Sequence, residues 1–208
     1  MGKLLVYIAI FCCTLGAVRA DSFGVSLGPF IKTSLVQDNL VWLTGARLGV
    51  TFDKEYYIGL SLYGTTFDSY KPNVQDLNYI LYPDFNFNFI GLEAEYNISP
   101  DSEIFPSICI NNGISLAKFD IPYSIDKNGQ LYNPNYRENT VSYYIEPSIN
   151  LNFNFKSFYK MSLCLSYRYA LLKKTAINGL VENNSQFYLD NSYLNGLNLA
   201  FSVRFGRF

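Results

Sequence analysis

The C-terminal stretch 193–208 alternates between apolar side chains and small or polar ones. One face carries only apolar residues, which are Leu197, Leu199, Phe201, Val203 and Phe205. The opposite face is small or polar and consists of Gly196, Asn198, Ala200, Ser202, Arg204 and Gly206. A period of two is the signature of a β-strand with unlike faces. The stretch therefore predicts a strand that separates two different surroundings.

Seven earlier segments alternate in the same way, and we predict strands at 23–31, 41–52, 56–63, 85–97, 107–116, 141–155 and 160–169. In the fourth of these, Phe85, Phe87 and Phe89 are out of phase with the apolar residues from Ile90 onward, which predicts a β-bulge near Phe89 and Ile90. Pro147 lies in the middle of the sixth strand and has no N–H to donate, so we expect a bulge or a local break there.

The connections between these strands alternate in length. Short turns are predicted at 53–55, 99–103 and 156–158, and long connections at about 32–40, 67–84, 118–139 and 171–192. Short turns at one end and long loops at the other are typical of outer-membrane barrels. The predicted fold class is all-β, an eight-stranded antiparallel up-and-down transmembrane β-barrel, with both termini at the short-turn, periplasmic end.

Periodicity alone does not say which face of such a barrel meets lipid. A lipocalin also has eight antiparallel strands, but its apolar face lines a cavity and its outer face is charged. Here the apolar faces carry no charged residue, and the whole chain is 49% hydrophobic but only 16% charged. A charge at the middle of a bilayer costs roughly 2–4 kcal/mol, so this absence indicates that the apolar face meets lipid. A soluble barrel with an apolar cavity stays the alternative.

The strand pattern, the loop alternation and the terminal Phe208 resemble the small eight-stranded bacterial outer-membrane β-barrels of the OmpA, OmpX and opacity-protein type. The resemblance covers residues 21–208. It implies that outer-membrane lipid surrounds the barrel and that the barrel-assembly machinery recognises the C-terminal strand through Phe208. Because Phe208 is out of phase with Phe205, either a bulge at 206–207 restores the phase or Phe208 points inward.

The first residues predict export. Lys3 precedes an apolar run from Leu4 to Val18, and Val18-Arg19-Ala20 ends in a small residue. This is the pattern of a secretory signal peptide. We therefore expect residues 1–20 to be a signal peptide for Sec-type export and residues 21–208 to form the barrel domain in the outer membrane.

The predicted inner face contains seven charged residues, Arg47, Glu93, Glu95, Glu146, Lys160, Arg168 and Arg204. Eight strands leave an interior that side chains fill, and an isolated buried charge is costly. We therefore expect a salt-bridge network that seals the lumen, in which Glu146 and Arg204 are energetically coupled. The alternative is that several of these residues lie near the lumen mouths in water.

Residues that carry common chemistry are scarce. The chain has no histidine, which removes the serine–histidine and aspartate–histidine arrangements of outer-membrane hydrolases. Outside the predicted signal peptide only Cys109 and Cys164 remain, and we expect two free thiols rather than a zinc site. With 16 basic and 17 acidic residues the chain has no basic excess for nucleic acid. We predict no enzymatic activity, no cofactor and no nucleic-acid partner.

The function that remains is structural or surface-interacting, through long extracellular loops that bind an unknown extracellular partner. Tyr123, Tyr132 and Tyr136 are the contact candidates. An accessory subunit of an envelope transport or secretion complex is an alternative. A secreted lipocalin-like binder of a small hydrophobic ligand is another, if the chain is soluble. A porin is disfavoured because eight strands leave no open channel.

Overall fold

The computed structural model describes most of the barrel and parts of its long connections. The described residues are 22–36, 39–66, 74–75, 79–81, 84–121, 124–126, 131–132, 136–156, 158–171, 175–177, 187–189 and 191–206. The predicted signal peptide at 1–20 and Phe208 lie outside them.

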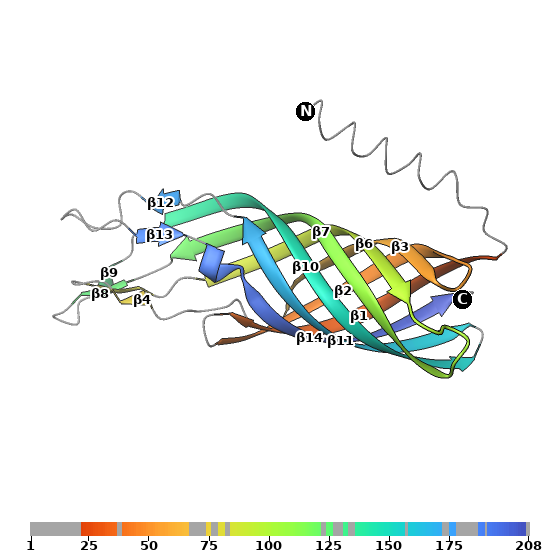
Figure 1. Ribbon diagram of the computed structural model, residues 1–208. Helices are drawn as coiled ribbons and strands as arrows, with labels where there is room; N and C mark the ends of the chain where they lie inside the picture. The colour runs from red at the N-terminus through yellow and green to blue at the C-terminus, as the bar shows by residue number, and fades with distance from the viewer. Residues whose placement is uncertain are drawn as a thin grey trace, which may run out of the picture.

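Eight strands form one closed antiparallel barrel (Figure 1). In chain order they are β1 (Phe23–Val36), β2 (Asn39–Phe52), β3 (Tyr56–Thr65), β6 (Asp84–Asn97), β7 (Ile104–Ile121), β10 (Tyr136–Lys156), β11 (Tyr159–Leu171) and β14 (Gly196–Gly206). Each strand pairs with its neighbour in this order, and β14 closes the barrel against β1. The predicted up-and-down eight-stranded fold is confirmed.

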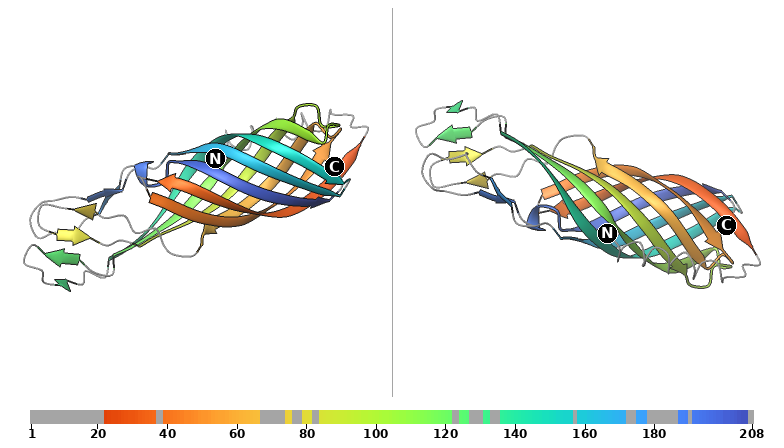
Figure 2. Two further views of the ribbon diagram at one scale, coloured as in Figure 1. Left: turned by 90° about the horizontal axis from the view of Figure 1, so that it is seen from below. Right: turned by 90° about the horizontal axis from the view of Figure 1, so that it is seen from above.

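Two small sheets lie in the long connections, beyond the end of the barrel that is opposite the C-terminus (Figure 2). One pairs β4 (Val74–Gln75) and β5 (Tyr79–Leu81) with β8 (Ser124–Asp126) and β9 (Leu131–Tyr132). The other pairs β12 (Thr175–Ile177) with β13 (Phe187–Leu189), and a 3-10 turn, η1 (Asn191–Tyr193), precedes β14. Among the described residues no helix is long and apolar enough to cross a membrane.

The alternation of each strand separates a lumen from an apolar outer wall. In β1, Ser26, Lys32 and Ser34 are buried, whereas Val25 and Leu27 are about half exposed. Inward glycines let neighbouring strands approach closely. A Cβ on Gly113, for example, would collide with the backbone carbonyl of the adjacent strand β6.

Several strands are longer than predicted. β1 continues to Val36, which pairs with Asn39 of β2, so the long connection predicted at 32–40 is wrong. Lys32 and Ser34 are polar residues that continue the inward face of β1, and sequence reasoning placed them in a loop. At the same end, β7 and β10 pair with each other up to Ile121 and Tyr136, beyond the ends predicted for them.

The bulge predicted near Phe89 and Ile90 is wrong. β6 keeps one register against β3 and one against β7 through these residues. Phe85, Phe87 and Phe89 are buried on the same inward face as Glu93 and the other polar lumen residues. What changes at Phe89 is the chemical character of each face rather than the phase of the strand.

Pro147 causes the predicted local break and no bulge. Its pairing with Ile110 of β7 belongs to an uninterrupted ladder. The ladder between β10 and β11 omits Glu146 and Pro147 and resumes at Ser148 in the same register. Asn154 donates its backbone N–H to the carbonyl oxygen of Glu103. The backbone N–H and C=O groups of even-numbered residues in β10 therefore point toward β7, and those of odd-numbered residues point toward β11. The missing N–H of Pro147 therefore affects only the β11 side.

Candidate functional site: the lumen and its aromatic plug

The lumen near the short-turn end is organised around Glu95. This carboxylate accepts two hydrogen bonds from Arg204, at 2.8 and 3.2 Å, and one from Ser107 at 2.6 Å. Lys160 lies 3.9 Å away on β11 and adds a second positive charge. Glu95, Arg204 and Lys160 come from β6, β14 and β11, and all are buried. The cluster therefore joins three strands of the barrel through one carboxylate.

Arg47 and Glu93 form a looser pair in the middle of the lumen. Their closest charged atoms are 3.7 Å apart, and neither Arg47 Nε nor Glu93 Oε2 has a hydrogen-bond partner among the residues that the structure describes. Both residues line a cavity of about 20 Å³, together with Lys32 and the two cysteines, Cys109 and Cys164. A space of this size accommodates one water molecule, which is able to donate to the carboxylate and accept from the guanidinium.

Glu146 organises the lumen toward the long-loop end. It accepts hydrogen bonds from Lys32 Nζ at 2.7 Å, Tyr63 OH at 2.9 Å and Ser166 Oγ at 2.6 Å. The ion-pair partner of Glu146 is thus Lys32, whereas Arg204 pairs with Glu95. The predicted coupling of Glu146 with Arg204 is wrong, because the barrel brings β1 rather than β14 opposite this part of β10.

Arg168 connects the lumen to the segment that closes it. Its side chain is completely buried, and it donates to the Leu194 carbonyl at 2.7 Å and to Ser34 Oγ at 3.0 Å. The guanidinium also lies over the ring of Phe89, 4.4 Å from its centroid. Leu194 directly follows η1, so Arg168 holds the chain before β14 against the top of the lumen.

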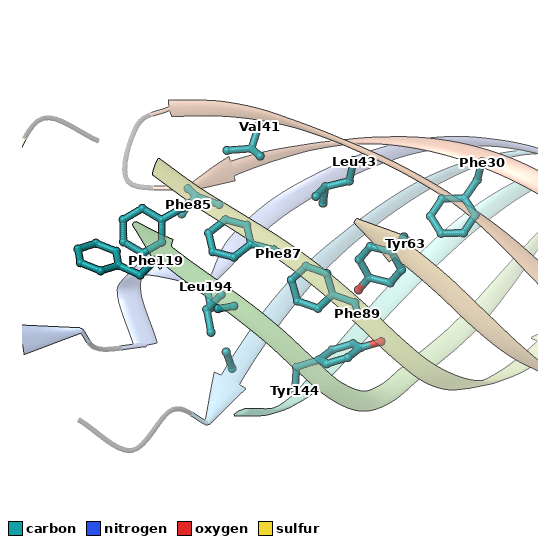
Figure 3. Close-up of a cluster of buried hydrophobic side chains, with 13 residues drawn as sticks. Phe30, Val41, Leu43, Tyr63, Phe85, Phe87, Phe89, Phe119, Tyr144 and Leu194 are labelled. Atoms are coloured by element: carbon teal, nitrogen blue, oxygen red, sulfur yellow. The ribbon is translucent and has the colours of Figure 1, made fainter. Parts of the chain in front are cut away.

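Above these charges the lumen is filled by aromatic side chains (Figure 3). We define the aromatic plug as Phe30, Tyr63, Phe85, Phe87, Phe89, Phe119 and Tyr144. Tyr63 stacks on Phe89 at 4.7 Å, and Phe85 contacts Phe119 at 4.6 Å between ring centroids. Tyr193 of η1 stacks on Phe85 at 5.2 Å. The long-loop end of the lumen is therefore an apolar core.

The outer faces of β6, β7 and β10 change from apolar to polar at the level of the plug. We call 84–89, 117–121 and 136–140 of these strands the barrel extension (Figure 1). Polar residues occupy its outer face, among them Asp84, Asn86, Asn88, Lys118, Asp120, Arg137 and Asn139. Arg137 donates to Asp120 at 2.8 and 3.0 Å. Apolar inside and polar outside is the arrangement of a water-soluble protein.

The seven charged residues predicted for the lumen all point inward and are buried. Six of them belong to ion pairs, Arg47 with Glu93, Lys160 and Arg204 with Glu95, and Glu146 with Lys32. Arg168 has neutral hydrogen-bond partners. Lys32 and the plug residues were not predicted as part of the site. The sequence signal for Lys32 is that it lies two residues after Phe30, so the alternation of β1 places both side chains on the inward face.

The three tyrosines predicted as loop contacts are placed differently. Tyr123 lies outside the described residues, and Tyr132 belongs to β9 in the predicted loop. Tyr136 begins strand β10 and pairs with Ile121, so its predicted place in a loop is wrong. Cys109 and Cys164 are free, as predicted. Among the described residues no group of three or more His, Cys, Asp or Glu side chains is arranged to hold a metal ion.

Comparison with solved structures identifies the fold. Neisserial surface protein A has a TM-score of 0.55 and 13% identity, over 92% of this chain and 100% of that one. A major outer membrane protein from Thermus thermophilus has a TM-score of 0.55 and 10% identity, over 89% and 99%. The outer membrane protein OprG from Pseudomonas aeruginosa gives 0.54 and 12%, over 90% and 96%.

These similarities show that the chain has the fold of small outer-membrane β-barrels, as the sequence pattern predicted. No protein-family model matches the sequence, and no curated protein matches it either.

Proposed function

We propose that this chain is an integral outer-membrane protein that presents its barrel extension and long loops to an extracellular partner. The observation that carries this proposal is the reversal of the inner and outer faces at the plug. Between the reversal and the short-turn end, the outer wall exposes aliphatic side chains, such as those of Leu60, Leu92 and Ile110, which require lipid around them. Between the reversal and the long-loop end, polar residues cover an apolar core and require water around them. A molecule with both surfaces spans a membrane and rises from it.

The orientation follows from the same reversal. β1 begins and β14 ends at the end of the barrel where the short turns lie, since Phe23 pairs with Phe52 and Leu27 with Phe205. This end faces the periplasm, and the extension and long loops face outward. Sec-type export by residues 1–20 and recognition of Phe208 by the assembly machinery belong to this proposal.

The lumen does not conduct and has no catalytic role in this proposal. The aromatic plug and the ion pairs of Glu95 and Glu146 fill it from both ends, which is the expected state of an eight-stranded barrel. Single-channel recording in planar bilayers tests this. We expect no conductance steps from the purified protein, and regular open-channel steps would contradict a sealed lumen.

Binding is tested by loop replacement. The chain between β3 and β6 and the chain between β7 and β10 are each replaced by a short turn, in cells that display the protein. We expect the replacements to keep the cold-to-boiled shift on SDS gels, which reports a folded barrel, and to lose adhesion to a matrix-protein or host-cell surface. Unchanged adhesion would refute a role for the loops. Co-purification of a stoichiometric envelope complex would instead support the accessory-subunit alternative.

A further inference from the structure

Asn112 of β7 places a side-chain amide on the lipid-facing wall of the barrel (Figure 1). It pairs with Leu92 of β6 and Ile145 of β10, and its partly exposed side chain lies on the outer face, since Asn111 points into the lumen. Among the described outward-facing residues between the barrel extension and the short turns, none carries a charge and Asn112 alone carries an amide. Asn112 is therefore an exception to the chemistry of this wall.

The Asn112 amide has too few hydrogen-bond partners. Its oxygen accepts one hydrogen bond from Tyr143 OH at 3.5 Å, which is long for such a bond. Its nitrogen has two hydrogens to donate and no acceptor among the residues that the structure describes. Thr33, a polar residue elsewhere on the outer wall, differs because its hydroxyl donates to the Leu199 carbonyl. The donors of Asn112 are thus left to find a partner outside this chain.

Asn112 is far from both polar ends of the wall. Lys118 marks the polar outer face of β7 in the barrel extension, and Ile104 begins the strand at the short-turn end. A strand that rises about 3.3 Å per residue and tilts by about 40° places Asn112 roughly 15 Å from the level of Lys118 and roughly 20 Å from that of Ile104. Headgroups and bulk water do not reach this depth, and an unpaired amide in hydrocarbon is costly. The partner of the amide must therefore lie within the membrane.

We infer that Asn112 is the centre of a lateral contact between two copies of this chain in one membrane. An asparagine amide carries an acceptor oxygen and two donor hydrogens, so two facing amides satisfy each other through a pair of N–H···O=C bonds. A two-fold axis along the membrane normal relates two copies in one membrane and brings a residue on the axis against itself. A second copy therefore supplies the matching amide at the same depth, whereas a different protein would need its own polar group at that level.

The residues around Asn112 suit such a contact. Leu92, Ile110, Ile114 and Ile145 surround the amide on the outer face, and all four are aliphatic. Packing them against a second copy replaces similar packing against lipid, so the amide pair decides where the two copies meet. The contact requires the lipid-facing wall but neither the loops nor an extracellular partner, and so it goes beyond the proposed function.

The test counts copies of the full-length protein in lipid vesicles by single-molecule photobleaching. The dye is attached at Lys54→Cys, an exposed position in a short turn, after Cys109→Ser and Cys164→Ser remove the two free thiols. We expect pairs that bleach in two steps as the protein-to-lipid ratio rises, and Asn112→Leu should weaken this association by about tenfold or more. Single-step bleaching of the protein with Asn112 at every ratio would overturn the inference, and so would equal association of Asn112→Leu.

Thr33→Val is the matched control. It removes a hydroxyl from the outer wall on β1, the strand opposite β7 in the closed barrel, where that hydroxyl already has an acceptor. We expect Thr33→Val to associate like the unsubstituted protein, and both variants to show the heat-dependent shift of a folded barrel. Equal weakening by the two variants would overturn the role of Asn112.

The identity of the partner is checked in native membranes. Outer membranes are extracted into copolymer nanodiscs, which keep lateral neighbours together, and the proteins in each particle are identified by mass. We expect particles that hold two copies of this chain, and fewer of them for Asn112→Leu. Particles that pair one copy with a different membrane protein would overturn the assignment of a second copy.

Discussion

Removal of the Glu146 carboxylate tests the assignment of the lumen ion pairs. In Glu146→Ala, Lys32, which is 5% exposed, loses its ion-pair partner at 2.7 Å, and Tyr63 and Ser166 lose their acceptor. Breaking a buried pair from one side costs about 3–5 kcal/mol. We therefore expect Glu146→Ala to lower the free energy of unfolding by at least about 3 kcal/mol.

The double variant distinguishes the partner of Glu146. Lys32→Met removes the charge that Glu146→Ala leaves unpaired, so the combined loss should be about 2–3 kcal/mol smaller than the sum of the single losses. Arg204→Met serves as the matched control, because Arg204 pairs with Glu95. Its effect should add to that of Glu146→Ala within about 0.5 kcal/mol.

Urea unfolding from lipid vesicles supplies these free energies. The single tryptophan, Trp42, lies on the outer wall, so its fluorescence reports the loss of lipid contact. Additive losses for Lys32→Met with Glu146→Ala would refute the direct pair. A larger coupling of Glu146 with Arg204 than with Lys32 would refute the strand arrangement that separates the two clusters.

Three further predictions use the same unfolding assay. Phe87→Ala should cost about 3–5 kcal/mol, because it opens a cavity in the plug, and a loss below about 1 kcal/mol would show that this end is not packed. Ile110→Arg places a charge on the lipid-facing wall and should cost roughly 2–4 kcal/mol, whereas a neutral effect would argue against lipid contact. Lys54→Ala removes an exposed pair with Asp101 and should change stability by less than about 1 kcal/mol, with a larger loss contradicting its solvent exposure.

Much of the barrel was predictable because alternation is a local property. The order of eight strands, the short turns at 53–55 and 99–103 and the inward direction of Glu95 and Arg204 all follow from residues close in sequence. The reversal at Phe89 is also visible in the sequence. The bulge prediction fails because it requires each face to keep one chemical character along the whole strand, whereas the faces of β6 exchange character at Phe89.

The partners of the lumen charges were not predictable in the same way. Lys32 and Glu146 are 114 residues apart, and their contact depends on how far each strand is staggered around the closed barrel. That stagger is fixed only when β14 pairs with β1. The local sequence also does not mark Lys32 as a strand residue that faces the lumen, because a lysine followed by threonine and serine has the composition of a loop.

The change from apolar to polar outer faces on β6, β7 and β10 also sets how deeply the barrel lies in the membrane. Each residue advances a strand by about 3.3 Å, and inward and outward residues change character over one or two positions, at Phe89 on β6 and near Ala117 on β7. Sinking the barrel would draw Asn88 and Lys118 into hydrocarbon, and raising it would expose Ile90 and Ile114 to water. Vertical displacement in either direction is therefore opposed by a restoring force. In the proposed orientation, the height at which the long connections stand above the membrane is set by these strands and not by the connections themselves.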